Sequence, residues 1–230
     1  MSHKIFRSFF VLVLVIGSVV TPAPQPVHAA GPWYVTPIGD DTNDCFSPVT
    51  ACATINGAIG KASSGDTVYV EEGTYTSSGT EVVLIDRDIT LSGGWDANFT
   101  AQTNTSVIDG QDTKRGIVMN SDVTATVDRF TIQNGLSADG GGGIINLGGT
   151  LTLNKSIVSN NQADCGISCD VYGGGIYNAG SLTTNESSIN DNTADGPGGG
   201  IFNYGGVLTL NSSTVAGNRA GDTLWGGGIY

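Results

Sequence analysis

Apolar side chains in the second half of the chain recur with a long period that is marked by glycine runs. The tetrapeptide Gly-Gly-Gly-Ile occurs four times, and its isoleucines (Ile144, Ile176, Ile201 and Ile229) lie 32, 25 and 28 residues apart. Between these runs, short stretches of alternating apolar and polar residues indicate β-strands. A period of about 20–50 residues indicates stacked units that bury their apolar faces only against one another.

Equivalent positions of the repeats predict vertical columns of matching side chains. An isoleucine and the asparagine two residues after it point to the same face of a strand. We therefore expect an apolar column beside an Asn ladder at two corners: Ile144, Ile176 and Ile201 with Asn146, Asn178 and Asn203, then Val158, Ile189 and Val215 with Asn161, Asn192 and Asn218. A β-sandwich or an up-and-down barrel also has many short strands, but only a parallel β-helix requires this vertical identity.

The first half of the chain has a different pattern. In residues 54–62, Ile55, Ala58, Ile59 and Ala62 have the spacing of one helical face, which predicts a short helix that caps the first coil. The remaining apolar runs are short and are separated by Gly, Asn, Asp and Ser, which is typical of strands. These expected strands cover residues 33–35, 67–70, 82–85, 89–91, 107–108, 117–119, 123–127 and 130–132.

Residues 1–30 have the pattern of a secretory signal peptide. Lys4 and Arg7 precede the apolar run 9–20, and small residues lead to a cleavage point near Ala30. This run is shorter than the roughly 20 residues of a membrane span, which favours removal after export over an uncleaved anchor. We expect an extracellular or cell-surface protein whose mature chain, residues 31–230, has no transmembrane span.

The mature chain would keep seven basic residues against 21 acidic residues, a formal charge of −14. Nucleic acid is therefore not an expected partner, because phosphate binding depends on clustered Lys and Arg. Both histidines lie in residues 1–30, so the mature chain has no imidazole for catalysis or metal binding.

The four cysteines form two local couples, Cys45 with Cys52 and Cys165 with Cys169. An exported chain with an even number of cysteines favours two disulfides. A metal site is the alternative, but these spacings, without a nearby histidine, fit zinc poorly.

Each of the first three Gly-Gly-Gly-Ile runs is followed by an apolar residue that has an Asn three positions after it, as in Val158 and Asn161. This pairing resembles the paired motifs of polymorphic outer-membrane-protein repeats. Those repeats form right-handed β-helices at the cell surface. The segments Ala53-Thr54-Ile55, Gly65-Asp66-Thr67-Val68-Tyr69-Val70 and Gly73-Thr74-Tyr75 resemble the first coil of bacterial pectate-lyase-like proteins. The resemblance implies an all-β, right-handed, single-stranded parallel β-helix with a short N-terminal capping helix. One departure is that the outer-membrane motif usually starts its apolar-x-x-Asn with Phe, where this chain has Val or Ile.

Two sets of residues are candidates for ligand contact. Four acids each precede a Gly-Gly-Gly-Ile and could share calcium at one edge of the stack, although ordinary turns also favour Asp: Asp139, Asp170, Asp195 and Asp222. Aromatic residues that follow the repeat isoleucines should point outward and could contact a glycan or a surface protein, although β-surfaces also favour aromatics: Tyr177, Phe202 and Tyr230, with Trp225 nearby. The recurring Asn-x-Ser matches the N-glycosylation acceptor, but we interpret it as a turn of each coil.

The sequence contains no Arg-x-Pro-x-x-Arg and no Gly-His-Gly, which are signatures of lyases and hydrolases with this fold. We therefore predict a non-enzymatic, adhesin-like or glycan-contacting scaffold with no cofactor other than calcium. The alternatives are a polysaccharide lyase or glycoside hydrolase, or a passenger that only holds another module away from the cell. Because Tyr230 directly follows the fourth repeat isoleucine, we also expect further coils or an anchor beyond it.

Overall fold

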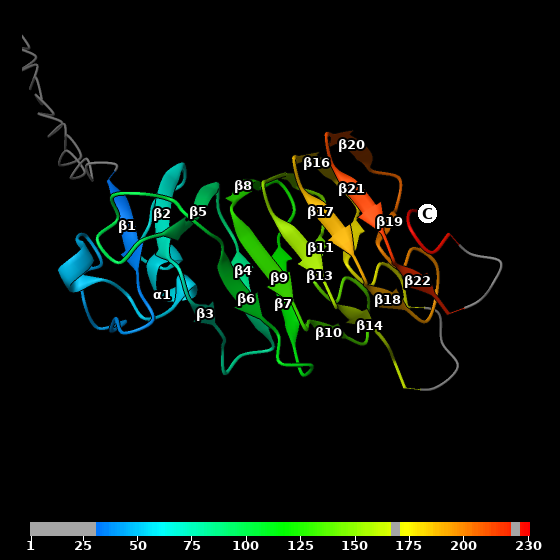
Figure 1. The fold of residues 1–230 in the computed structure, drawn as a ribbon, viewed down its shortest axis with the longest axis horizontal. Helices are drawn as coiled ribbons and strands as arrows, with labels where there is room; N and C mark the ends of the chain where they lie inside the picture. The colour runs from blue at the N-terminus through cyan, green and yellow to red at the C-terminus, as the bar shows by residue number, and fades with distance from the viewer. Residues whose placement is uncertain (1–30, 167–170, 222–225) are drawn as a thin grey trace, which may run out of the picture.

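A computed structural model describes residues 31–166, 171–221 and 226–230, and it forms a right-handed parallel β-helix (Figure 1). The coils follow one another along the long axis, from β1 at the N-terminal end to β19–β22 at the other end. Each complete C-terminal coil passes through four sheets in turn, here called C, A, B and D. The predicted architecture is confirmed.

All four sheets are parallel, and strands that neighbour each other in a sheet come from successive coils. Sheet A contains β1 (Pro32–Val35), β2 (Asp66–Glu71), β5 (Ile89–Trp95), β8 (Thr124–Asp128), β12 (Thr150–Asn154), β16 (Ser181–Asn185) and β20 (Val207–Asn211). Sheet B contains β3 (Thr74–Tyr75), β6 (Ser106–Asp109), β9 (Phe130–Gln133), β13 (Ile157–Ser159), β17 (Ser188–Asn190) and β21 (Thr214–Ala216). Sheet C contains β4 (Glu81–Ile85), β7 (Arg115–Met119), β11 (Ile144–Asn146), β15 (Ile176–Asn178) and β19 (Ile201–Asn203). Sheet D contains β10 (Leu136–Ser137), β14 (Gln162–Ala163), β18 (Thr193–Ala194) and β22 (Arg219–Ala220).

The apolar columns lie in the core as predicted. In sheet C, Ile144, Ile176 and Ile201 are fully buried partners in register, and Ile229 continues the column through an isolated bridge. In sheet B, the register aligns Val158, Ile189 and Val215. One column is interrupted, because Thr184 occupies the interior position between Leu153 and Leu210. Its hydroxyl is the one buried side-chain polar atom without a partner in the described part of the chain.

Both interior Asn ladders are present, and each is a chain of hydrogen bonds between coils. In sheet C, the Asn146 Nδ2 donates to Asn178 Oδ1 at 2.8 Å, and the Asn178 Nδ2 donates to Asn203 Oδ1 at 2.7 Å. At the other corner, Asn161 donates to Asn192 and Asn192 donates to Asn218, each at 2.9 Å. Asn146, Asn178 and Asn192 are fully buried. Their amides therefore need these partners, because an unpaired buried amide costs about 1–3 kcal/mol.

The glycine runs are required where successive coils come closest. Gly173 has a φ of +68°, a conformation that other residues rarely adopt. A Cβ on the next residue, Gly174, would lie 2.2 Å from the carbonyl oxygen of Thr193 on the following coil. The repeated triple glycine is thus explained by one left-handed turn followed by close backbone packing.

The N-terminal end is covered by α1 (Ile55–Ile59) and a preceding 3-10 turn, η1 (Pro48–Thr50). The Thr54 side chain caps α1 by accepting a hydrogen bond from the Gly57 amide, and Ile55 and Ile59 are buried in the core. The predicted helix is confirmed, but it ends at Ile59 instead of continuing to residue 62. The predicted Cys45–Cys52 disulfide is also present in this region.

The Asn-x-Ser segments form the corner between sheets A and B, as interpreted from the sequence. Their middle residues adopt positive φ, between 47° and 50°: Lys155, Glu186 and Ser212. The flanking asparagines form a third ladder on the outside of the coil, in which Asn185 donates to Asn154 at 2.8 Å.

Candidate functional site

A row of aromatic rings crosses the outer side of sheet C in the C-terminal coils. We call it the aromatic ladder, and it consists of Tyr172, Tyr177, Phe202, Tyr204 and Tyr230. The β15–β19 register places Tyr177 beside Phe202, with ring centroids 5.5 Å apart. Phe202 also stacks on Tyr172 at 4.6 Å and on Tyr230 at 5.7 Å. The structure therefore brings together three of the four aromatic residues that were candidates from the sequence: Tyr177, Phe202 and Tyr230. The fourth, Trp225, lies outside the described residues.

The ladder has a buried centre and exposed ends. Phe202 is 9% exposed because its neighbours cover it, whereas Tyr204 is 65% exposed and Tyr230 is 51% exposed. Burial, and then the neighbouring phenols of Tyr204 and Tyr172, raise the pKa of Tyr177. Its hydroxyl therefore stays neutral at physiological pH. The ladder offers ring edges, ring faces and neutral hydroxyl groups to a ligand.

The candidate acids that can be placed do not share one column. The carboxylate of Asp139 accepts hydrogen bonds from Ser137 and from Arg115, and it forms an ion pair with Arg115. The β14–β18 register instead aligns Ala163 with Ala194, so that Asp195 follows Asp164 on the neighbouring coil. Burial, and then Asp164, raise the pKa of Asp195. Asp170 and Asp222 lie outside the described residues, as does Cys169, while Cys165 is disulfide-bonded.

A second group of aromatic residues lies in the N-terminal coils and was not singled out in the sequence. We call it the N-terminal aromatic cluster, and it consists of Tyr34, Tyr69, Trp95 and Phe99. Tyr69 stacks on Trp95 with centroids 4.5 Å apart, and the edge of Tyr34 meets Tyr69 at 5.9 Å. The one sequence signal is that Tyr34-Val35 and Tyr69-Val70 repeat an outward tyrosine before a buried valine.

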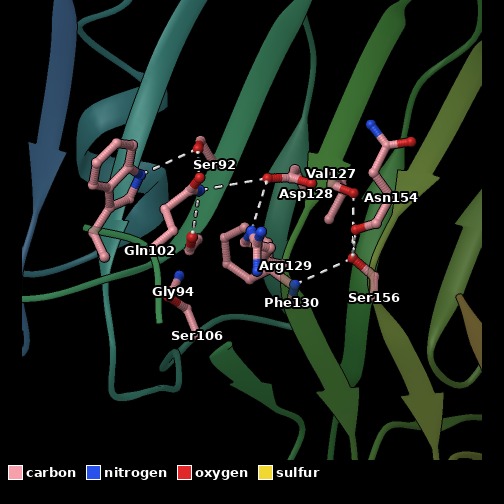
Figure 2. Close-up of polar contacts among 12 residues, drawn as sticks. Ser92, Gly94, Gln102, Ser106, Val127, Asp128, Arg129, Phe130, Asn154 and Ser156 are labelled. Carbon is pink, nitrogen blue, oxygen red and sulfur yellow. Dashed lines mark hydrogen bonds and ion pairs between the residues drawn. The ribbon is translucent and has the colours of Figure 1, made fainter. Parts of the chain in front are cut away.

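A polar network continues from this cluster along sheet A (Figure 2). The Trp95 indole donates to the Ser92 hydroxyl at 3.1 Å, and the Gln102 amide donates to the same hydroxyl at 2.9 Å. The Gln102 amide also reaches Asp128 at 3.4 Å, and Asp128 lies 3.8 Å from the Arg129 guanidinium. These side chains come from β5, from the loop after β5, and from the last residue of β8 and the residue that follows it. The network therefore connects two successive coils.

A cavity of about 280 Å³ lies beside this cluster, at the N-terminal end of the molecule. Its lining includes two carboxylates and two exposed aliphatic side chains, and it is formed by Thr36, Ile38, Gly39, Asp40, Asn43, Pro48, Val49, Ala51, Glu71 and Ala97. We call it the N-terminal pocket. Within the described ranges, no three His, Cys, Asp or Glu side chains are grouped in a way that could hold a metal ion.

Comparison with known proteins identifies the fold but no family. No family model matches the chain, and no curated protein matches it. The crystal structure of pectate lyase Pel9A is similar, with a TM-score of 0.50 and 16% sequence identity over 86% of this chain. This chain spans 57% of the length of that structure. The likeness supports the parallel β-helix, while the resemblance to polymorphic outer-membrane-protein repeats stays a prediction.

In the part of the chain that the structure describes, no helix is long and apolar enough to cross a membrane. The signal peptide predicted for residues 1–30 lies outside that part and also stays a prediction.

Proposed function

We propose that the protein is an extracellular or cell-surface scaffold that contacts neutral glycans through the aromatic ladder. The observation that carries the proposal is the stack of Tyr177, Phe202 and Tyr230 across three successive coils. Aromatic faces pack against the apolar faces of sugar rings, and the tyrosine hydroxyl groups can hydrogen-bond to the sugar. The rigid β-helix holds the rings in place before binding, which lowers the entropic cost of association.

The charge of the chain supports a neutral ligand over an acidic one. The whole chain carries a formal charge of −12, and nine Lys and Arg residues oppose 21 Asp and Glu residues. A polyanionic glycan would be repelled by this surface, because like charges oppose association over roughly 10 Å at moderate salt.

Affinity electrophoresis against a panel of neutral polysaccharides tests the proposal. Tyr177→Ala combined with Tyr204→Ala should weaken binding about tenfold, because each lost aromatic contact contributes about 0.5–1.5 kcal/mol. Ile157→Ala, which removes an exposed apolar side chain from sheet B, is the matched control and should bind normally. Unchanged binding by the double variant, or no retention of the unmodified protein on any member of the panel, would contradict the proposal.

A carbohydrate-active enzyme is the second candidate, because the similar structure is that of a pectate lyase. The side chains that favour it are Asp128 and Arg129, which lie beside Gln102 on one face of the coil. Incubation with polygalacturonate should then release unsaturated products, and Arg129→Gln should abolish the release. A lack of products from the unmodified protein, with calcium present and absent, would exclude this reaction on that substrate.

A further inference from the structure

The N-terminal pocket and the N-terminal aromatic cluster share one outer surface. Glu71 of the pocket lining follows Tyr69 by two positions within β2, and the strand register pairs it with Trp95 of β5. Two further lining residues, Thr36 and Ala97, come just after the ends of β1 and β5. Side chains two positions apart in a strand point to the same face. A ligand in the pocket can therefore extend directly over the rings of Tyr69 and Trp95.

The charges in the pocket favour a cation. The Glu71 carboxylate has no hydrogen-bond or ion-pair partner among the described residues, whereas its acidic neighbours are already engaged. Thr103 and Asn104 donate to Glu72, and Thr100 donates to Asp96. Burial, and then the charges of Glu72 and Asp96, raise the pKa of Glu71. A positive group beside Glu71 would stabilise its charged form and so offset the cost of burial and the repulsion from Glu72 and Asp96.

The second carboxylate of the pocket is held in place. The Asp40 Oδ1 accepts hydrogen bonds from the backbone and the hydroxyl of Thr42, each at 2.8 Å. The Thr42 hydrogen bonds lower the pKa of Asp40 more than the charge of Lys61 does. The Lys61 ammonium instead donates at 2.7 Å to the backbone oxygen of Asp41. The Asp40 Oδ2 thus remains available to a ligand.

The rim of the pocket is apolar and open. Ile38 is 94% exposed and Val49 is 92% exposed. Both flank the cavity, so a ligand with an apolar face would cover them while its polar edge faces the carboxylates.

We propose that the N-terminal pocket binds an amino sugar of a glycan, with the ammonium between the Glu71 and Asp40 carboxylates. The apolar face of the sugar packs on Ile38 and Val49, and the next sugar of the chain packs on the N-terminal aromatic cluster. The flat rings favour a sugar over a lysine side chain, whose flexible stem has no face to stack. This site is separate from the aromatic ladder and does not depend on it.

Titration calorimetry of the full chain with a glucosamine oligosaccharide tests this inference, with the N-acetylated oligosaccharide of the same length as its neutral counterpart. The unmodified protein should bind the free amine at least about tenfold more tightly, because only the free amine gives the two carboxylates a charged hydrogen-bond donor. Glu71→Gln keeps the shape of the side chain and should remove that preference. Glu186→Gln, an exposed change on a distant coil, should leave the preference intact.

Equal affinity for the two oligosaccharides, or an unchanged preference in Glu71→Gln, would overturn the inference. Oligolysine tests whether the site recognises any amine. If it binds as tightly as the amino sugar and with the same dependence on Glu71, the site recognises any amine and the sugar assignment is wrong. The double variant Tyr177→Ala with Tyr204→Ala should not alter any of these affinities. This control distinguishes failure of the N-terminal pocket proposal from failure of the proposal that the aromatic ladder contacts glycans.

Discussion

The N-terminal and C-terminal coils share sheets A, B and C but hold together in different ways. In the C-terminal coils, like residues stack on like residues, as in the Asn146–Asn178–Asn203 ladder. In the N-terminal coils, each level has its own contacts, such as the Cys45–Cys52 disulfide and the stacking of Tyr69 on Trp95. Repetition stabilises the C-terminal stack and aligns its outward rings, whereas departures from repetition form a pocket at the N-terminal end.

The largest effect is expected where the coils are closest. Gly174→Ala would force a Cβ against the Thr193 backbone oxygen, 2.2 Å away, and should lower the free energy of unfolding by about 3 kcal/mol. Gly60→Ala, at the end of α1 in the N-terminal region, has an ordinary helical φ of −61° and should change stability by less than about 1 kcal/mol. Urea denaturation measures both. Equal losses would show that close packing does not distinguish the two regions.

The disulfide should matter only to the N-terminal region. Replacing both Cys45 and Cys52 by Ala opens a short loop and should cost about 2–3 kcal/mol. Hydrogen exchange should then show faster opening of β1 and α1, with no change in β15–β19. A uniform increase in exchange would mean that the two regions unfold as one cooperative unit.

Removing one member of an interior Asn ladder should lower the free energy of unfolding slightly less than removing the disulfide does. Asn178→Leu deprives the Asn146 amide and the Asn203 oxygen of their partner, with an expected loss of about 1–3 kcal/mol. Asn185→Leu on the same coil breaks the outer ladder, where water can replace the lost bonds, and should cost less than about 1 kcal/mol. Thermal unfolding of the pair measures the difference. A loss of the same size in both variants would remove the distinction between inner and outer ladders.

The smallest effect is expected where two like charges, those of Asp164 and Asp195, lie on neighbouring coils. The pKa of Asp195 is raised in the folded state, first by burial and then by Asp164, so the folded protein binds this proton more tightly than the unfolded chain. The free energy of unfolding therefore rises as the pH falls through the folded-state pKa of Asp195, and it decreases as the pH rises through that pKa. Asp195→Asn should therefore stabilise the protein at neutral pH by less than about 1 kcal/mol, and the gain should vanish in acid.

Melting temperatures at neutral and acidic pH measure this difference. A gain that is independent of pH would assign the effect to packing. Millimolar calcium should raise the melting temperature of the unmodified protein, but not of Asp195→Asn, if the predicted calcium site includes this residue.

Sequence patterns predicted the C-terminal coils in detail because equivalent residues recur. The register of Ile144 with Ile176, and of Asn146 with Asn178, follows directly from the repeat. The calcium hypothesis grouped Asp139 with Asp195 by their distance from the next isoleucine, but strand register aligns Asp164 with Asp195 instead. A difference of a few residues in loop length is enough to move a side chain to another column.

The N-terminal aromatic cluster could not be predicted in the same way. Tyr34, Tyr69 and Trp95 come from three coils of unequal length, and Phe99 belongs to a loop that folds back toward β1. No periodicity connects these positions. Tyr34 and Tyr69 are register partners in β1 and β2. The position of Trp95 beside Tyr69 depends on the bulge between β2 and β5, which shifts the register before Trp95 and is not visible as a sequence pattern.

The interior Asn ladders have a direction, since each amide donates to the coil that follows and accepts from the coil before. A gene segment that encodes one such coil could therefore be duplicated in tandem without leaving an amide unpaired at either junction. Every added coil would also extend the row of outward aromatic positions by one rung. The length of the surface proposed to contact glycans is thus open to adjustment by recombination, one coil at a time, without redesign of the core.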